Sequence, residues 1–467
     1  MLPAASSRAA GSPSPIVRLL VLLPLLLAAF CLLLQAQRRS PDVALGLTGG
    51  RDGGLRLRNE PSLEDSLGGG KGKTRQAGMG TAQNVVNSNA LPNGAKKQGA
   101  KLAIATTTAA GVDSIKVWMR YHKSIGFSMF YLFLNGQVNH DAAIWELGRW
   151  SGVKLFPNNE RLQHRHAHSR AWNETWLSAF FNKPCNNELF VMQSLNMEVA
   201  IQQAMEDGVD WIFHLDTDEL LYPGGTGSFS IQEYMDSLDD DIDSVVFPNY
   251  EGLAERDDVT DPFTEVTLFK RNFAHVNSDE YFKKYSIVAR GNPNYFTTYG
   301  NGKSAGRIQP HLRSNGAHRW YIYGKKPKEI TSTEPTVLHY VYNKYADLKG
   351  RRDRCDCAPT DEDVKRCFIL PFDREAFLAS SLKDDKELRQ YFRDKLVWSD
   401  RSQVKDLLKG GLFVRIHVPQ VMTQMYRKMP DAGLILAGPE ESKVTVMDAY
   451  QMPEESNEHL NVQVHSS

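Results

Sequence analysis

The 467-residue sequence predicts an α/β fold with a mostly parallel sheet, an N-terminal membrane anchor and a C-terminal helical extension. Apolar runs typical of strands alternate with helical patterns between residues 101 and 215, and an unbroken apolar run occupies residues 19–34. Charged helical stretches follow residue 345. Strands that alternate with helices indicate βαβ units, in which helices cover both faces of a Rossmann-like sheet.

The overall charge argues against one class of partner. Lysine plus arginine and aspartate plus glutamate are balanced at 55 each. Proteins that bind nucleic acid need a strongly basic surface, because they must neutralise phosphates. We therefore expect no nucleic-acid partner.

The N-terminal apolar run predicts a transmembrane signal anchor at residues 19–36, after a short cytoplasmic tail at 1–18. The run is short for a membrane span, and short spans suit the thin membranes of the early secretory pathway. A cleaved signal peptide is the alternative. Arginines flank the run on both sides, so charge does not fix the orientation. We expect a single-pass type II protein of the Golgi or ER membrane, with the plasma membrane as the other destination.

Residues 37–100 are rich in glycine and poor in aromatic side chains, which predicts a flexible stem. Asn173 begins the Asn-Glu-Thr sequon and is a candidate glycosylation site if this face is lumenal. An oxidising lumen also permits two disulfides, in any of three pairings, among the four cysteines outside the anchor, Cys185, Cys355, Cys357 and Cys367. A partial zinc site at the last three cysteines is the alternative.

The elements predicted from residue 101 onward follow one another in a regular order. Strands are expected at 101–107, 127–134, 153–156 and 211–215, and helices at 113–125, 142–150 and 188–207. Later strands are expected at 244–247 and 336–342, and a helix at 384–397. The predicted organisation is one catalytic domain at 101–345, a helical extension at 346–430 and a loose tail at 431–467. Parallel sheets bind ligands at the carboxyl ends of their strands, so the residues after each strand are the candidates for a site.

Two carboxylates follow the strand at 211–215. If extended geometry continues, Asp216 and Asp218 point to the same side while Thr217 points away. Such a pair suits Mg²⁺ or Mn²⁺, which would act as a Lewis acid on a diphosphate leaving group. An Asp-x-Asp tripeptide is a weak signal by itself, and an ordinary acidic loop is the alternative.

Three segments carry a resemblance to a known family: WMRYHKSIGFSMFYLFLNGQ from Trp118, WIFHLDTDELLYP from Trp211, and VLHYVY at 337–342. They resemble GT-A glycosyltransferases of the family 2-like and family 92-like groups. The ordered part as a whole is similar to plant glycosyltransferase-like proteins of the KOBITO type. The resemblance implies a GT-A fold whose first strands bind a nucleotide sugar, with Asp216 and Asp218 as the DxD ligands of metal and diphosphate. The sequence departs from the family 2-like pattern at 106–110, where Thr-Thr-Thr-Ala-Ala replaces an often acidic position.

Several further residues are candidates for the same site. His339 resembles the histidine that supplies a third metal ligand in many GT-A enzymes, and a hydrogen-bonded core histidine is the alternative. An inverting transfer needs a carboxylate base for the acceptor hydroxyl. The candidates for this base are Glu251, Asp257 and Asp258, in the segment after the 244–247 strand, and Glu219 beside the DxD motif.

Basic residues complete the set of candidates. Lys303 and Arg307 are expected to neutralise the diphosphate, although residues 299–304 read as a turn and not as a phosphate loop. The run His164 to Arg170 alternates histidine and arginine, which suits a metal or an anionic sugar, with a solvated basic loop as the favoured interpretation.

These observations predict a membrane-anchored glycosyltransferase, dependent on Mn²⁺ or Mg²⁺. It would move sugar from a nucleotide-sugar donor to a glycan or glycolipid acceptor in cell-wall polysaccharide formation. The alternative from another class is a catalytically inactive glycosyltransferase-like membrane protein that regulates cellulose or wall synthesis and cell elongation.

Overall fold

The computed structural model describes residues 99–174, 177, 186–276, 284, 301–353, 357–368, 370–429, 434–438, 442 and 445. The predicted anchor at 19–36 and almost all of the predicted stem lie outside these residues. Within the described ranges, no helix is both long and apolar enough to cross a membrane.

The main sheet has seven strands in the order β12-β6-β9-β4-β1-β2-β3. Its strands are β1 (Leu102–Thr108), β2 (Met129–Leu134), β3 (Val153–Pro157), β4 (Trp211–His214), β6 (Ser244–Phe247), β9 (Lys303–Arg307) and β12 (Glu329–Thr331). All neighbouring strands pair in parallel except β9, which runs antiparallel to both β4 and β6. The prediction of a mixed α/β fold with a mostly parallel sheet is confirmed.

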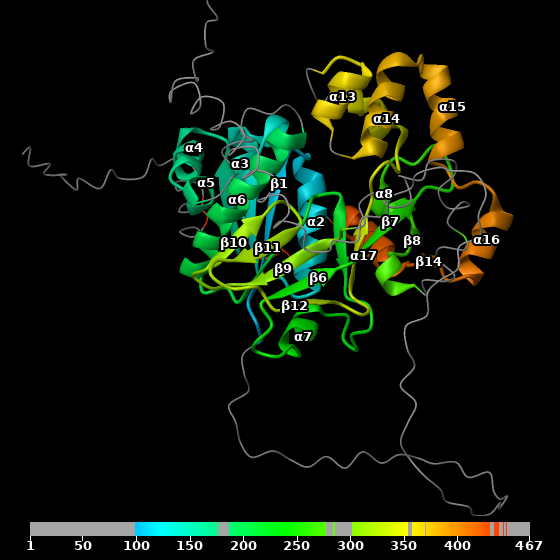
Figure 1. Cartoon of the computed structure of the whole chain (residues 1–467). Coiled ribbons are helices and arrows are strands. Elements are labelled where there is room, and N and C mark those ends of the chain that lie inside the picture. The colour runs from blue at the N-terminus through cyan, green and yellow to red at the C-terminus, as the bar shows by residue number, and fades with distance from the viewer. Residues whose placement is uncertain are drawn as a thin grey trace, which may run out of the picture. The chain divides into compact units, whose positions relative to one another are not determined.

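Helices cover both faces of this sheet (Figure 1) because its strands are apolar on both sides. In β1, Leu102 and Ile104 pack into one buried cluster, together with α2 (Val112–Ser124) and α3 (Asp141–Gly148). Ala103 and Ala105 face the other way and pack against α6 (Asn186–Glu206). The period-two alternation along the strand therefore sends its side chains into two separate cores.

A second, mixed sheet has the order β14-β8-β7-β13-β5 and was not predicted. Its strands are β5 (Glu219–Tyr222), β7 (Asn249–Leu253), β8 (Leu268–Lys270), β13 (Thr336–His339) and β14 (Phe413–Arg415). Only β7 and β13 pair in parallel. Because only four residues separate β4 from β5, the chain passes from one sheet to the other at the DxD motif.

The predicted C-terminal extension is mostly helical, but it is part of the folded unit that spans Leu91–Ser467. Its helices are α12 (Tyr345–Lys349), η4 (Gly350–Asp353), α13 (Asp361–Cys367), α14 (Pro371–Leu382), α15 (Asp385–Lys395), α16 (Arg401–Lys409) and α17 (Val418–Lys428). Strand β14 of this segment completes the second sheet by pairing with β8. Helix α17 is anchored where Thr423 Oγ1 donates to the carbonyl of Phe263, 2.8 Å away, and where Arg120 of α2 donates to the carbonyl of Tyr426 at 2.9 Å.

The remaining elements connect these layers. They are η1 (Gly136–Val138), α4 (Glu160–Ala167), α5 (Arg170–Glu174), α7 (Ile231–Asp236), α8 (Pro262–Glu265), η3 (Phe273–His275), β10 (Leu312–Asn315) and β11 (Arg319–Ile322). Strands β10 and β11 pair with each other in antiparallel orientation. The basic run at 164–170 lies mostly on helices α4 and α5, so the expected loop is wrong, although His164 and His168 are exposed as expected. Asn159 caps α4, and His166 on that helix is buried, with its Nε2 2.8 Å from Asn196 Oδ1.

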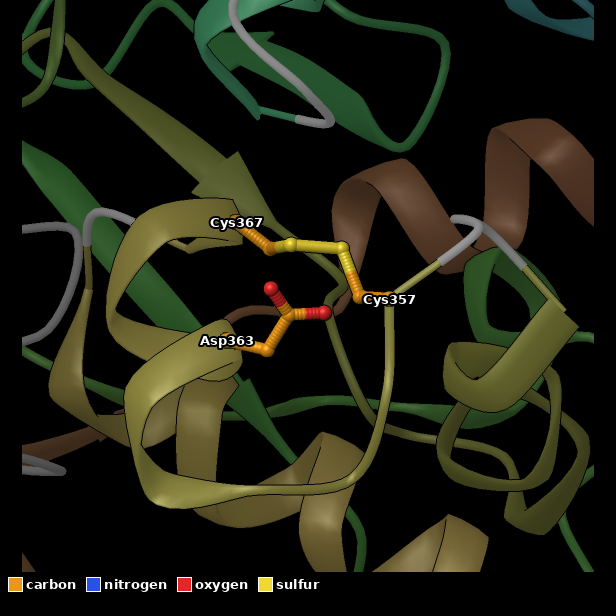
Figure 2. A group of neighbouring side chains, drawn as sticks. All are labelled: Cys357, Asp363 and Cys367. Carbon is orange, nitrogen blue, oxygen red and sulfur yellow. A yellow bond between two sulfur atoms is a disulfide. The ribbon is translucent and has the colours of Figure 1, made fainter.

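Cys357 and Cys367 form a disulfide, with Asp363 beside it on α13 (Figure 2). Among the described residues, these three make the only group of three or more His, Cys, Asp or Glu ligand atoms within 4.8 Å of one another. The two sulfurs are bonded to each other and are not thiolates, and a cysteine binds zinc only as a thiolate. The zinc alternative is therefore wrong for this pair, while Cys185 and Cys355 lie outside the described residues.

Candidate active site

The DxD motif lies in a tight turn and not in a continued strand. The backbone N–H of Glu219 donates to the carbonyl of Asp216 at 3.1 Å, which closes a four-residue turn between β4 and β5. The N–H of Tyr340 donates to the carbonyl of Asp218 at 2.9 Å and ties the turn to the end of β13. Because extended geometry stops before Asp216, the period-two argument does not describe how the two carboxylates point.

Helix α2 holds the strand that follows this turn. Trp118 Nε1 donates to the carbonyl of Glu219 at 2.8 Å, and the Tyr121 hydroxyl donates to the carbonyl of Leu221 at 3.0 Å. His122 Nε2 accepts from the N–H of Leu221 at 3.2 Å. These bonds come from one buried face of α2, so the WMRYH segment fixes the position of β5 and, through it, of the DxD turn.

Asp216 binds a buried lysine. Lys303 Nζ lies 2.6 Å from Asp216 Oδ2 and 3.6 Å from Glu219 Oε2, and the lysine side chain is 2% exposed. The other oxygen of Asp216, Oδ1, accepts from Gln193 Nε2 of α6 at 3.0 Å. Burial alone would lower the pKa of Lys303, but the attraction of Asp216 and Glu219 outweighs it and raises that pKa. Lys303 is therefore a fixed positive charge at the carboxyl end of β4.

Asp218 faces a histidine on the second sheet. His339 Nε2 lies 3.8 Å from Asp218 Oδ2, and His339 Nδ1 lies 3.0 Å from Glu251 Oε2. Strand pairing explains the arrangement, since His339 is in register with Glu219 on one side and with Glu251 on the other. Asn249, two residues before Glu251, donates to Glu251 Oε1 and holds that carboxylate in place.

The electrostatics around His339 favour a positive charge. Burial opposes protonation, yet Glu251, Asp218 and Glu219 together raise the pKa of His339 to about 10. In Glu219, burial and the repulsion of Asp216 and Asp218 outweigh Lys303 and raise the pKa to about 8. The site therefore holds two cationic groups, Lys303 and His339, among its carboxylates.

The three predicted metal ligands do not all meet. His339 Nε2 approaches Asp218, whereas Asp216 is bonded to Lys303. Across the described residues, Asp216, Asp218 and His339 do not bring three ligand atoms within 4.8 Å of one another.

Three of the other predicted residues lie apart from this cluster. Asp257 pairs with Arg393 of α15 at 2.6 Å, and Asp258 pairs with Arg256 at 2.6 Å. Because β9 is antiparallel to its neighbours, Lys303 aligns with the carboxyl end of β6 while Arg307 aligns with Trp211 at the opposite end of β4. The guanidinium of Arg307 donates to the carbonyls of Ile242 and Asp239, at 2.8 and 3.0 Å.

The last predicted site residue is the glycosylation candidate. Asn173 lies on α5 with an exposed side chain, and its backbone N–H donates to the carbonyl of Ser169 at 3.1 Å. Its position is open to solvent, as a glycan would require.

Some residues of the site were not predicted from the sequence. Gln193 contributes from α6, and Thr108 Oγ1 at the end of β1 lies 3.3 Å from Thr217 Oγ1 of the turn. A threonine hydroxyl thus contacts the turn from the end of the first strand. Asn249 had a usable signal, because the pattern Asn-x-Glu puts two polar side chains on one face of a strand.

Known proteins resemble this chain over most of its described length. The Arabidopsis thaliana protein named glycosyltransferase-like At3g57200 is 49% identical over 328 residues, which is 70% of this chain and 64% of that protein. Another, glycosyltransferase-like At2g41451, is 48% identical over 328 residues, 70% of this chain and 73% of that protein. The chain thus spans less than two thirds of the first relative's length.

Two other comparisons add little. No protein-family model matches the chain. A solved glycosyltransferase, involved in the glycosylation of the major capsid of PBCV-1, aligns with 51% of this chain and 92% of its own at 13% identity. Its TM-score is 0.18, a value too low to carry weight. The identity and coverage shared with the plant relatives are decisive instead: the chain belongs to the family of these glycosyltransferase-like proteins.

Proposed function

We propose that this chain is a metal-dependent glycosyltransferase of the GT-A class that moves sugar from a nucleotide-sugar donor to a glycan or glycolipid acceptor. The observation that supports the proposal is the meeting of Asp218 with His339 next to the Lys303–Asp216 pair, at the carboxyl end of β4. This end of a parallel sheet is where nucleotide-type ligands bind in α/β proteins.

The residues present fit a hard divalent cation, Mn²⁺ or Mg²⁺. The donor set would be one carboxylate from Asp218 and one imidazole nitrogen from His339, whose Nε2 proton the ion would have to displace. Such ions often take one or two protein ligands together with substrate phosphates. Glu251 binds His339 Nδ1, which leaves Nε2 directed at Asp218. When bound, the ion would stabilise the charge that develops on the leaving diphosphate.

Residues of the chain itself would supply a further positive charge and hold His339 in position. Lys303 provides a second, permanent positive charge whose position Asp216 and Gln193 fix, and such preorganised charge favours an anionic leaving group. Glu251 acts through His339 as a positioning residue and does not face an acceptor, because its side chain is buried. Glu219 is equally buried, with its Oε2 accepting from the N–H of Asp216 at 2.9 Å.

One observation favours the second candidate function, a glycosyltransferase-like protein without turnover. Of the four predicted bases, Glu251 and Glu219 are buried, and Asp257 and Asp258 are in surface ion pairs with arginines. None of the four is an unpaired carboxylate beside Asp218. A protein that binds nucleotide sugar but regulates wall synthesis is consistent with this arrangement.

The test is donor hydrolysis by the full-length chain in detergent, screened over UDP- and GDP-sugars with Mn²⁺. We expect release of nucleoside diphosphate that chelation abolishes and that falls at least 100-fold in Asp218→Asn and His339→Gln. Asp257→Asn is the matched control, because it removes a predicted base that lies in a surface ion pair. Metal-dependent nucleotide binding without hydrolysis would favour the second candidate, and neither binding nor hydrolysis would contradict both.

The membrane anchor at 19–36, the Golgi or ER location and a role in cell-wall polysaccharide formation are further parts of the proposal and rest on the sequence. Residues 101 onward would lie in the lumen, where Asn173 would carry a glycan. A glycan that endoglycosidase removes from wild type and that Asn173→Gln lacks would support this orientation. An unmodified Asn173 in secretory membranes would count against it.

A further inference from the structure

A cavity lies along the outer edge of the main sheet, beside β3. Its volume is about 740 Å³, and it is bounded by β3, α4 and the end of α6. Strand β3 is the last in the sheet order, pairs with β2 and lines this space, and Thr445 Oγ1 donates to the carbonyl of Val153 at its outer edge, 3.5 Å away. The charged side chains that line it are Lys154, Arg161, Arg165 and Glu206.

The cavity is separate from the donor site. Strand β3 lies three positions from β4 in the sheet order β4-β1-β2-β3. With strands about 4.8 Å apart, this places the edge about 14 Å from the strand that precedes the DxD turn. Neither Asp218 nor Lys303 lines the cavity.

Two arginines in this cavity have no hydrogen-bond partner within the described part of the chain. Arg161 and Arg165 lie one turn apart on α4, so both point from the same side of the helix. Arg165 stacks on Phe156 of β3, with its guanidinium carbon 5.4 Å from the ring centroid, and Phe156 stacks in turn on Phe133 at 4.5 Å. The aromatic pair holds Arg165 in position and leaves its N–H donors available.

The other charged groups of the cavity are already bonded. Lys154 Nζ pairs with Asp207 Oδ1 at 2.7 Å, and Glu206 Oε2 accepts from Gln203 Nε2 at 2.9 Å. Two guanidinium charges therefore face one carboxylate, Glu206, which leaves an excess of positive charge. Burial and the repulsion of Arg161 lower the pKa of Arg165, a cost that a bound anion would relieve.

We propose that this cavity binds a small acidic sugar, whose carboxylate or phosphate group is held by Arg161 and Arg165. Guanidinium groups match the planar oxygens of carboxylate and phosphate through paired N–H bonds. The polar side chains of Ser128 and Gln203, which also line the cavity, suit the hydroxyls of a sugar ring. The proposal does not depend on transferase activity, since it concerns binding alone.

The experiment is calorimetric titration of the full-length chain with D-glucuronate, glucose 6-phosphate and D-glucose. We expect at least one acidic sugar to bind and D-glucose not to bind. Arg161→Gln and Arg165→Gln should each weaken that binding at least tenfold, and Arg165→Lys should weaken it less than Arg165→Gln because it keeps the charge. The stronger of the two acidic ligands identifies carboxylate or phosphate as the natural group.

Matched controls separate this site from the rest of the molecule. Arg389→Gln, an exposed arginine of α15 that pairs with Asp385, should leave binding unchanged, and so should Asp218→Asn in the donor site. Equal binding of D-glucose, or acidic-sugar binding that survives both glutamine substitutions, would overturn the proposal. Binding that appears only after the residues beyond Thr445 are removed would also overturn it, in favour of the chain's own tail as the occupant.

Discussion

Replacing Lys303 with methionine tests how much the buried Lys303–Asp216 ion pair at the DxD turn stabilises the folded chain. The change keeps most of the side-chain volume but leaves Asp216 and Glu219 without their cation, which lies 2.6 and 3.6 Å away in the native chain. Removing one partner of a buried pair costs about 3–5 kcal/mol, because the remaining charge is uncompensated. Asp216 is 31% exposed and keeps some contact with water, so we expect the lower end, about 3 kcal/mol.

The assay is thermal unfolding of the full-length chain in detergent. For a domain of this size, about 3 kcal/mol corresponds to a fall of about 5 °C in Tm. Lys328→Met is the matched control, since that lysine pairs with Asp241 on the surface, where the two side chains are 51% and 66% exposed. Its Tm should change by less than about 2 °C, because exposed pairs contribute at most about 1 kcal/mol.

A double variant checks the cause. Asp216→Asn in the Lys303→Met background removes one uncompensated charge, and it should recover about 1 kcal/mol or more of the lost stability. The reasoning is refuted if Lys303→Met melts within 1 °C of the native chain. It is also refuted if the double variant is no more stable than Lys303→Met alone.

Three further predictions follow from the same contacts. Glu251→Gln should weaken Mn²⁺ binding about 10- to 100-fold, because the neutral amide holds His339 less firmly, and titration of activity against Mn²⁺ measures this; an unchanged Mn²⁺ requirement would contradict the positioning role. Cys357→Ser should lower the free energy of unfolding by about 3 kcal/mol, because the Cys357–Cys367 disulfide closes a loop with a sequence separation of 10. A melting temperature equal to that of wild type would contradict this prediction. Burial lowers the pKa of His122 from 6.5 to about 3, so between these pH values the unfolded chain binds a proton that the folded chain does not. The free energy of unfolding should therefore fall by up to about 1.4 kcal/mol per pH unit as the pH drops below 6.5. His122→Gln should lose less stability than wild type between pH 6.5 and 5, and an equal loss of stability would refute this.

The first half of the main sheet was predictable because its signals are local. Strand β1 and helix α2 differ from the predicted 101–107 and 113–125 by only one residue at each end. Apolar runs in the strands and helical spacing in α2 lie within single elements, so no knowledge of the partner strands is needed. The motif at Asp216 was likewise visible as acids after an apolar strand.

The second sheet was not predictable in the same way. Its strands are three to five residues long, and β14 pairs with β8 across more than 140 residues of sequence. The neighbourhood of Glu251 and His339 arises from pairing of β7 with β13, 88 residues apart. Nothing in the local sequence around Glu251 indicates a histidine partner, so the sequence alone predicts that Glu251 is a candidate base in a loop.

The two basic residues of β9 show that residues close in sequence need not lie in the same site. Lys303 and Arg307 are four residues apart and were given the same role. An extended strand places residues four apart about 13 Å from each other, so one reaches Asp216 and the other lies at the far end of β4. Predicting a strand at 303–307 would place Lys303 and Arg307 at opposite ends of that strand, whereas the predicted turn at 299–304 does not distinguish their positions.

The measurement that tests the central claim most directly is UDP binding by the full-length chain with Mn²⁺ and with chelator. We predict binding at least tenfold tighter with Mn²⁺, a difference that Asp218→Asn and His339→Gln remove and that Asp257→Asn retains. UDP binding equal in both conditions, or a Mn²⁺ effect that persists in both site variants, would contradict a metal site at Asp218 and His339.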